Sequence, residues 1–197
     1  MRKMKKLLSL ILTLVLVMGL SVNVLAEGAL AATIQYSTSR TAPTVGEEFT
    51  VTAKITEQTG FNALDIQLVY DDQVVQFLGF ETEYDEDEGE DILVTDLTGF
   101  TISYNETKPK VSMARAKDSV KTGEIFTARF KALALGNTGI TLNEDTFSMA
   151  SGNGDKLTVT QDFSGIENLA VVEVVDDPVA DEGYTVSLTP ATQEKVV

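Results

Sequence analysis

The side chains in this sequence that could carry out chemistry are mostly carboxylates. The chain of 197 residues has 30 Asp and Glu against 15 Lys and Arg, with no His and no Cys. Without His and Cys, nucleophilic catalysis by Ser-His-Asp or Cys-His groups is excluded, and so are the usual structural zinc sites. A pair of carboxylates could hydrolyse a glycoside, but no two acidic residues stand out as such a pair. We therefore expect a protein without enzymatic activity.

The densest group of carboxylates lies in residues 81–91, which read ETEYDEDEGED. Calcium prefers oxygen ligands, so this run could attract it. The spacing differs from an EF-hand loop, because counting from Asp85 places glycine fifth rather than sixth and Asp96, not Glu, twelfth. We expect a solvated loop that binds calcium weakly at most, and no dedicated metal site.

A more informative carboxylate is Asp65, which lies inside a strand pattern. Residues 64–70, LDIQLVY, alternate apolar side chains with Asp65, Gln67 and a valine. Successive side chains of a β-strand point to opposite faces, so the apolar row enters a core while Asp65 and Gln67 lie on an outer face. An acidic turn then leads into a second apolar strand at residues 74–80.

Strands of the same kind account for the rest of the pattern. They are expected at residues 33–37, 49–55, 100–104, 111–116, 126–132, 140–142, 147–150, 157–159 and 169–175. No segment sustains a period near 3.6, and short strands between turns are typical of an all-β sandwich or barrel. Residues 126–132 alternate most clearly and place Arg129 outward. If Val111 and Met113 point inward, Arg115 would too, so a bulge or a strand end is expected there.

Residues 1–26 are predicted to be a secretory signal peptide. A basic head precedes an apolar run at residues 7–20, and a small-residue cleavage pattern ends at Ala26, with a second candidate at residues 29–31. The alternative is an uncleaved membrane anchor, but the apolar run is short for a bilayer span. We expect the protein to be secreted, with no membrane contact after cleavage, either free or held at the cell surface by another protein.

Charge and cysteine content limit the partners and the sources of stability. Removing the four basic residues of the signal segment changes the formal charge from −15 to −19. Such a surface repels nucleic acid and anionic membranes, and it keeps a secreted protein soluble. An exported chain without Cys has no disulfides, so its stability must come from a hydrophobic core.

The predicted domain covers residues 32–175. Residues 176–183 are acidic and contain Pro and Gly, as a linker does, and residues 184–190, YTVSLTP, are similar to the first predicted strand. Residues 176–197 are therefore either a tail or a linker followed by the start of a second, truncated domain.

The order of these motifs resembles that of a cohesin domain. Residues 45–80 contain a Gly-acidic-Phe-Thr-Val strand followed by a strand of the form Asp-x-x-hydrophobic-x-Tyr-Asp, and residues 116–119 (AKDS) and 123–132 (GEIFTARFKA) are similar to later cohesin motifs. The resemblance covers residues 32–175. It implies a nine-stranded antiparallel jelly-roll sandwich that binds a dockerin, a small helical module of polysaccharide-degrading enzymes. The dockerin carries the calcium, so no cofactor is implied for this chain.

The resemblance also implies a binding face, formed by the strands at residues 65–70, 111–116, 126–132 and 147–150. Asp65 matches the most recognisable carboxylate of that face, and Gln67 is its outward neighbour. The further candidates are Tyr104, where cohesins often carry a contacting aromatic residue, Arg129, on the clearest strand, and Asn153, in the loop after the last face strand. Lys117 departs from the family, because some cohesins carry an acidic contact there.

Two other functions remain open at this stage. A sandwich of the same fold could bind polysaccharide or the cell envelope directly, or it could be a structural spacer. Sugar-binding modules usually stack sugar rings on flat aromatic side chains, and this chain has no Trp and five Tyr. The expected partners are therefore dockerin-bearing secreted enzymes first and polysaccharide second.

Overall fold

The computed structural model describes residues 30–87 and 89–173. The predicted signal peptide, residues 1–26, and the predicted tail, residues 176–197, lie outside these ranges. Within the described residues the regular elements are all β-strands, and no helix there could cross a membrane. The strands are β1 (Ala31–Thr38), β2 (Glu48–Gln58), β3 (Phe61–Val69), β4 (Val75–Phe80), β5 (Thr82–Asp85), β6 (Glu90–Leu93), β7 (Thr101–Tyr104), β8 (Lys110–Ser119), β9 (Gly123–Ala132), β10 (Gly136–Asn137), β11 (Thr141–Leu142), β12 (Ser148–Ala150), β13 (Thr158–Asp162) and β14 (Ala170–Val171).

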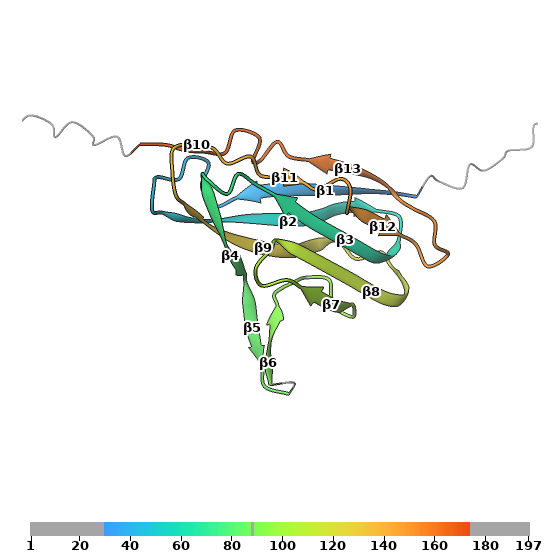
Figure 1. The fold of residues 1–197 in the computed structure, drawn as a ribbon. Helices are drawn as coiled ribbons and strands as arrows, with labels where there is room; N and C mark the ends of the chain where they lie inside the picture. Colours follow the sequence, from blue (N-terminus) through green and yellow to red (C-terminus); the bar gives the residue numbers. More distant parts are fainter. Residues whose placement is uncertain (1–29, 88, 174–197) are drawn as a thin grey trace, which may run out of the picture.

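Two sheets form the body of the molecule (Figure 1). The first has the order β13-β1-β2-β9-β4 and is antiparallel except for the β1–β13 pair, which is parallel. The second has the order β11-β3-β8-β7, and β12 also pairs with β3. Because β8 occupies one edge of β3, β11 and β12 must share the other edge as one interrupted strand. Counted in this way, the two sheets have nine strand positions, and the predicted antiparallel jelly-roll sandwich is confirmed.

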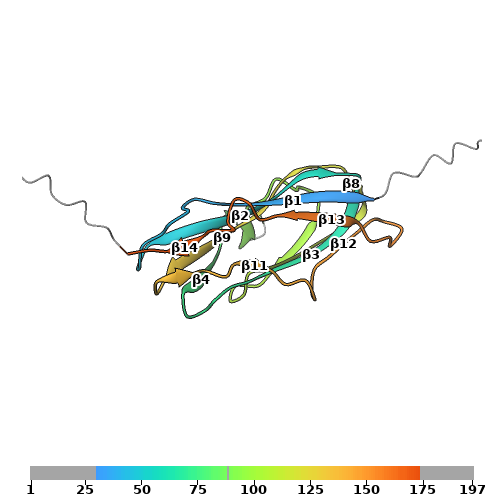
Figure 2. The same cartoon turned by 90° about the horizontal axis from the view of Figure 1, so that it is seen from above.

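The two ends of the described chain lie at opposite ends of this sandwich. Figure 2 shows β1 running along the molecule, with residue 30 at one end and residue 173, just after β14, at the other. β13 lies beside β1 and runs in the same direction. β1, β2 and β13 thus follow the long axis of the molecule (Figure 1).

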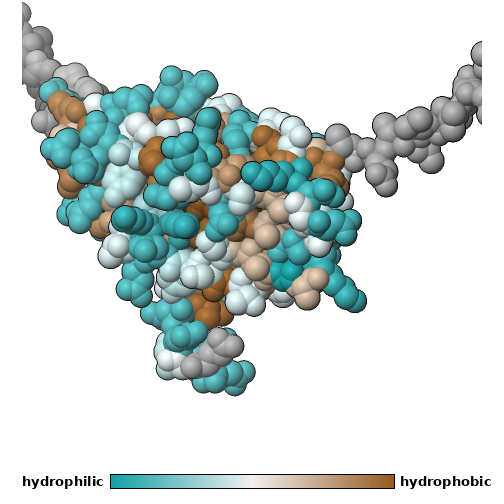
Figure 3. Space-filling view, turned by 45° about the vertical axis from the view of Figure 1, so that its right-hand side comes forward, coloured by the Kyte–Doolittle hydropathy of each residue, from teal (hydrophilic) through white to brown (hydrophobic). Residues whose placement is uncertain are grey.

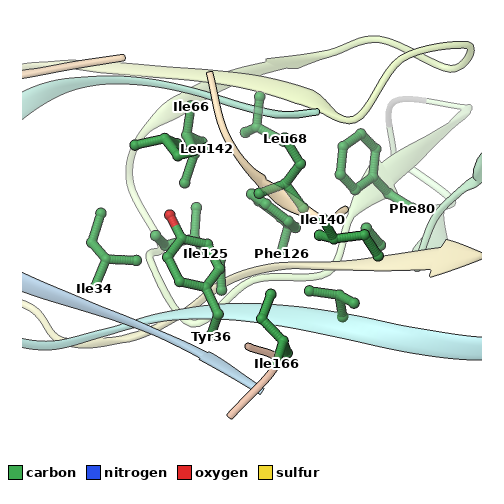
Figure 4. Packing of buried hydrophobic residues seen from close by; sticks show 14 of the residues in the cluster. Ile34, Tyr36, Ile66, Leu68, Phe80, Ile125, Phe126, Ile140, Leu142 and Ile166 are labelled. Atoms are coloured by element: carbon green, nitrogen blue, oxygen red, sulfur yellow. The ribbon is translucent and has the colours of Figure 1, made fainter. Parts of the chain in front are cut away.

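The core lies between the sheets and takes side chains from both. Figure 4 shows Ile34 and Tyr36 from β1 and Phe126 from β9 together with Ile66 and Leu68 from β3. All five are almost completely buried. Removing a Leu or Ile side chain from water contributes about 2 kcal/mol, so this layer is a main source of stability.

The alternation predicted for β3 is confirmed. Leu64, Ile66 and Leu68 are 1%, 0% and 1% exposed, whereas Asp65 and Gln67 between them are half-buried on the outer side. The acidic turn after β3 carries the chain from the second sheet to the first, since β4 pairs with β9. In this turn the N–H groups of two valines, Val74 and Val75, donate to the C=O of Asp71.

The interruption expected in the strand at residues 111–116 is a bulge in β8. Ala63 pairs with Ala114, but Phe61 pairs with Ser119, so residues 115–118 of β8 stand opposite a single residue of β3. Arg115 is the first residue of this bulge, and its side chain is half-buried. Its guanidinium lies over the ring of Phe100, 5.2 Å from the ring centroid.

Two expectations about the elements are wrong. Residues 126–132 belong to β9, which pairs with β2 and β4 in the first sheet and is therefore not part of the sheet that contains β3. Residues 81–91 are not a loop, because β5 and β6 form a hairpin with Glu83 opposite Ile92. The side chains of this hairpin are largely exposed, so backbone pairing rather than burial defines it.

Candidate functional site

Asp65 lies at the centre of the outer face of the second sheet, in a row of small polar side chains. The strand register places Ser148 of β12, Asp65 of β3, Ser112 of β8 and Ser103 of β7 side by side. The Ser112 hydroxyl donates to Oδ1 of Asp65 over 2.5 Å, and the Ser148 hydroxyl donates to Oδ2 over 3.4 Å. Both carboxylate oxygens are thereby oriented by neighbouring strands, and their remaining lone pairs can accept hydrogen bonds from outside.

A row of alanines runs beside the polar row. Ala150, Ala63 and Ala114 are paired across β12, β3 and β8, and Thr101 of β7 continues the row. Ala114 is exposed, and the other two alanines are half-buried. Because the three alanines carry only methyl groups, another backbone or helix can approach β12, β3 and β8 closely here. The Asp65 carboxylate projects beside this flat apolar strip.

On the other side of the polar row, the side chains of the face are longer, and one of them is charged. Gln67 pairs with Lys110, and beyond them Val69, 37% exposed, pairs with Thr141 of β11. A cation and an amide thus border the Asp65 row. The outer face therefore has an apolar strip, a carboxylate row and a polar margin in sequence along β3.

Tyr104 does not lie on this outer face, contrary to the expectation. It pairs with Val111, which is fully buried, so its side chain points to the core side of the sheet. Its ring packs edge-on against Phe80 at 6.0 Å, and its hydroxyl donates to the backbone C=O of Asp91 over 2.8 Å. Desolvation of the phenol raises the pKa of Tyr104, and the negative charges of Asp91, Glu106 and Glu90 raise it further.

Arg129 lies on the opposite side of the molecule from Asp65. It points outward from β9, as expected, but β9 belongs to the first sheet. Its Nη2 forms an exposed ion pair with Oε2 of Glu48 at 3.1 Å. One flat partner therefore cannot contact Asp65 and Arg129 together, and grouping them on one face was wrong.

Asn153 is exposed in the turn after β12. This turn is fastened to the end of β8 by the N–H of Gly152, which donates to Oδ1 of Asp118 over 2.6 Å. Asn153 thus lies beyond the end of β12 at the margin of the Asp65 face. Of the five residues expected from the sequence, Asp65 and Gln67 share the face and Asn153 lies at its edge.

The sequence reasoning missed the serines and alanines that shape the face. Ser112 and Ser148 orient Asp65, and Ala63, Ala114 and Ala150 keep the neighbouring strip flat. None of these five stands out in the sequence, because small residues are common on any strand. Only the strand register could have identified them, and the bulge in β8 obscures it.

The chemistry available at this face is hydrogen bonding and contact. Within the described ranges no three acidic side chains are grouped so that they could hold a metal ion. Asp65 has hydroxyl donors as its neighbours, and serine hydroxyls beside a carboxylate fix its orientation. Together, the fold and this flat face define a β-sandwich module with an open sheet as its candidate binding surface.

Comparison with known proteins places this module in a family. The family model of the cohesin domain matches residues 34–166, more than half of the sequence. The chain belongs to the cohesin domain family. Cohesin domains are non-catalytic protein-interaction modules. No curated protein matches the chain.

Several solved structures are similar to it. The third cohesin of ScaC from Acetivibrio cellulolyticus, solved in complex with the ScaB dockerin, has 22% sequence identity and a TM-score of 0.47, and the match covers 68% of this chain and 94% of that one. A type II cohesin module of the ScaA scaffoldin from the same organism has 16% identity and a TM-score of 0.44, with 69% and 93% covered. A non-cellulosomal cohesin from Archaeoglobus fulgidus has 18% identity and a TM-score of 0.44, with 68% and 84% covered.

Proposed function

We propose that this protein is a secreted, non-catalytic cohesin module that binds dockerin modules of polysaccharide-degrading enzymes. The binding surface is the outer face of β12, β3, β8 and β7. The observation that carries the proposal is the Asp65 row, in which two serine hydroxyls hold the carboxylate at the centre of an open sheet. Membership of the cohesin family supports the class of partner.

The dimensions of the face suit a protein partner. β12, β3, β8 and β7 have 3, 9, 10 and 4 residues, 26 in total. At about 3.3 Å of rise per residue and about 4.8 Å between strands, they give a flat area of roughly 400 Å². The accessible area is larger once side chains and bordering turns are counted, and a standard interface needs about 800 Å² per partner. An apolar strip of alanines beside a fixed carboxylate supplies contact and register together.

The dockerin assignment is supported by the family and by a solved relative. The structure of the ScaC cohesin was solved in complex with the ScaB dockerin. In the present chain the partner would bring its own calcium, and the cohesin would supply the flat face. Secretion follows from the predicted signal peptide at residues 1–26.

A pull-down against dockerin-bearing secreted enzymes, with and without a chelator, tests the proposal. We expect partners that are retained in calcium and released by the chelator. Asp65→Ala should weaken retention, and Arg129→Ala is the matched control, because Arg129 lies on the first sheet. Equal loss in both variants would place the binding surface elsewhere.

Retention of the protein on insoluble polysaccharide, without any calcium-dependent partner, would favour direct carbohydrate binding. A protein that captures neither would be a structural spacer. Either result would overturn the dockerin assignment.

A further inference from the structure

A groove separate from the Asp65 face lies between the β5–β6 hairpin and the edge strand β7. It consists of a cavity of about 520 Å³ and an adjoining one of about 360 Å³. Glu90, Asp91, Ile102 and Tyr104 line both cavities, so the two are continuous. In Figure 3, hydrophobic surface is visible where the hairpin joins the body of the molecule.

One wall of this groove is an unpaired sheet edge. β7 is the last strand of the second sheet and pairs only with β8. The N–H of Asn105 donates to the C=O of Lys110 over 3.0 Å. This bond shows which residues of β7 form hydrogen-bonded pairs with β8 and which do not. Alternate residues of such a ladder direct their backbone groups away from the partner strand, and here these are Ile102 and Tyr104. Across the described parts of the chain, the N–H groups of Ile102 and Tyr104 donate no hydrogen bond to another backbone group, and their C=O groups accept none.

The edge strand is short, at four residues, but its sequence has no residue that would block pairing with another strand. Natural proteins block such edges with Pro, Lys or a covering element. β7 reads TISY and contains neither Pro nor a charged residue. The nearby hairpin touches it through the hydrogen bond from the Tyr104 hydroxyl to Asp91 and leaves the groove open beside it.

The groove combines apolar side chains with acidic walls. Leu97, Phe100 and Ile102 contribute the apolar part. The acidic residues lining one or both cavities are Glu83, Asp85, Glu90, Asp91 and Glu106. Neither cavity is lined by Lys or Arg. An occupant must therefore offer apolar side chains to the interior and positive charge to the walls.

We propose that this groove binds an extended, Lys- or Arg-containing segment of another protein, which adds to β7 as a further strand. Pairing with the backbone groups of Ile102 and Tyr104 provides the affinity, and the carboxylates select basic side chains. The chain itself has a formal charge of −15, so a second copy is disfavoured as the occupant by charge repulsion. The segment would lie beside the Asp65 face, at the free edge of the same sheet.

The test uses a fluorescent peptide of alternating Lys and Val, eight residues long, and measures its binding to the full chain by fluorescence anisotropy. Two control peptides accompany it: one with Glu in place of Lys, and one with N-methyl groups on one edge of the backbone. We expect the Lys-Val peptide to bind saturably, and the N-methylated peptide to bind about tenfold or more weakly, because backbone pairing is lost. The Glu peptide should not bind.

Two matched double variants separate this site from general attraction to an acidic protein. Glu90→Gln with Asp91→Asn removes two charges from the groove. Glu144→Gln with Asp145→Asn removes two charges between β11 and β12. We expect the first pair to weaken binding about fivefold to tenfold and the second less than about twofold.

Amide hydrogen exchange provides a readout that charge alone would not change. In the complex, the N–H groups of Ile102 and Tyr104 should become protected. Equal effects of the two double variants, equal binding of the N-methylated peptide, or absence of saturable binding would each overturn the proposal. Unchanged melting temperatures of the variants would show that they still fold.

Discussion

The hydroxyl of Ser112 donates to Oδ1 of Asp65 over 2.5 Å, between two residues that face each other on β8 and β3. In the same register, the N–H of Leu68 donates to the C=O of Pro109. Asp65 and Ser112 are therefore a non-hydrogen-bonded pair, the type whose side chains are closer together. The carboxylate is thus held by the geometry of the ladder itself.

Ser112→Ala should weaken partner binding while leaving the fold intact. The substitution removes the closer of the two hydroxyls that orient Asp65, so the carboxylate must be ordered on binding. The free energy of unfolding should fall by about 1 kcal/mol or less, the usual contribution of one partly exposed hydrogen bond. Calorimetric titration with the partner and urea unfolding check both effects. A loss of stability comparable to that of a core truncation would contradict this assignment.

Asp65→Asn offers a finer comparison with Asp65→Ala. The amide keeps one acceptor oxygen and the side-chain shape but loses the charge. We expect Asp65 to recognise a cation of the partner. The Asn variant should then lose about 1.5–3 kcal/mol of binding free energy, the value of a charged hydrogen bond, and bind nearly as weakly as the Ala variant. Binding close to that of the unmodified protein would show that only an acceptor is needed. Isothermal titration at two salt concentrations distinguishes these cases.

Gly123→Ala should be strongly destabilising. Gly123 has φ of +140°, and a Cβ added there would lie 2.5 Å from the Cβ of Asp96. Asp96 cannot easily move, because its Oδ2 accepts the N–H of Glu124 over 2.8 Å. We expect the free energy of unfolding to fall by about 3 kcal/mol or more.

Gly79→Ala is the control for this substitution. Gly79 has φ of +123°, but nothing lies within 4 Å of an added Cβ. Gly79→Ala should lower the free energy of unfolding by about 1–2 kcal/mol, through backbone strain alone. Chemical unfolding of both variants gives the difference, and equal losses would mean that the Asp96 contact is relieved without cost.

The phenols of Tyr36 and Tyr104 should ionise at higher pH than free tyrosine. Burial raises the pKa of Tyr36, and desolvation with nearby carboxylates raises that of Tyr104. Because both pKa values are raised on folding, the stability contribution is complete below about pH 10 and is lost as the pH rises above it. Ultraviolet titration of Tyr36→Phe and Tyr104→Phe should each lack one late-ionising group. A late phase of undiminished amplitude in either variant would contradict the assignment of the tyrosine that it lacks.

Asp162 should contribute to the acid sensitivity of the protein. Hydrogen bonds from Ser164, and then from Gln35, lower the pKa of Asp162 below its usual value of 3.8. Its stabilising contribution is therefore present above that value and is lost as the pH falls through the lower folded-state pKa. Asp162→Asn should reduce the stability difference between neutral and strongly acidic pH. Urea unfolding across this pH range gives the free energy of unfolding at each pH. The same dependence of this free energy on pH in the variant and the unmodified protein would contradict the prediction.

Alternation was sufficient to predict the two faces of individual strands. Leu64, Ile66 and Leu68 are buried and Asp65 is outward, because the period of two is fixed by the backbone. Alternation does not say which strands become neighbours. Arg129 is outward as predicted, yet it lies on the other sheet, because β9 pairs with β2 and β4.

Register explains the remaining differences. Tyr104 lies on the core side with Ile102 because it pairs with Val111, and the alternation of residues 101–104 agrees with this side. The resemblance to cohesins, not the alternation, had placed Tyr104 on the binding face. Ser112 of β8 and Ser148 of β12 lie beside Asp65 because their strands pair with opposite edges of β3. The β5–β6 hairpin escaped prediction because its side chains are mostly charged and mostly exposed, so no buried apolar row marks its strands.

The opposite placement of residues 30 and 173 has a mechanical consequence (Figure 2). Tension applied between them would run along β1, which is held between β2 and β13. The register joins β1 to β13 at five pairs, from Ala31 to Gln35, and to β2 from Ala32 to Thr38. Pulling would load these ladder bonds in shear, all at once, rather than opening them one after another. The geometry is that of a link that resists stretching while its broad face stays free to hold a partner.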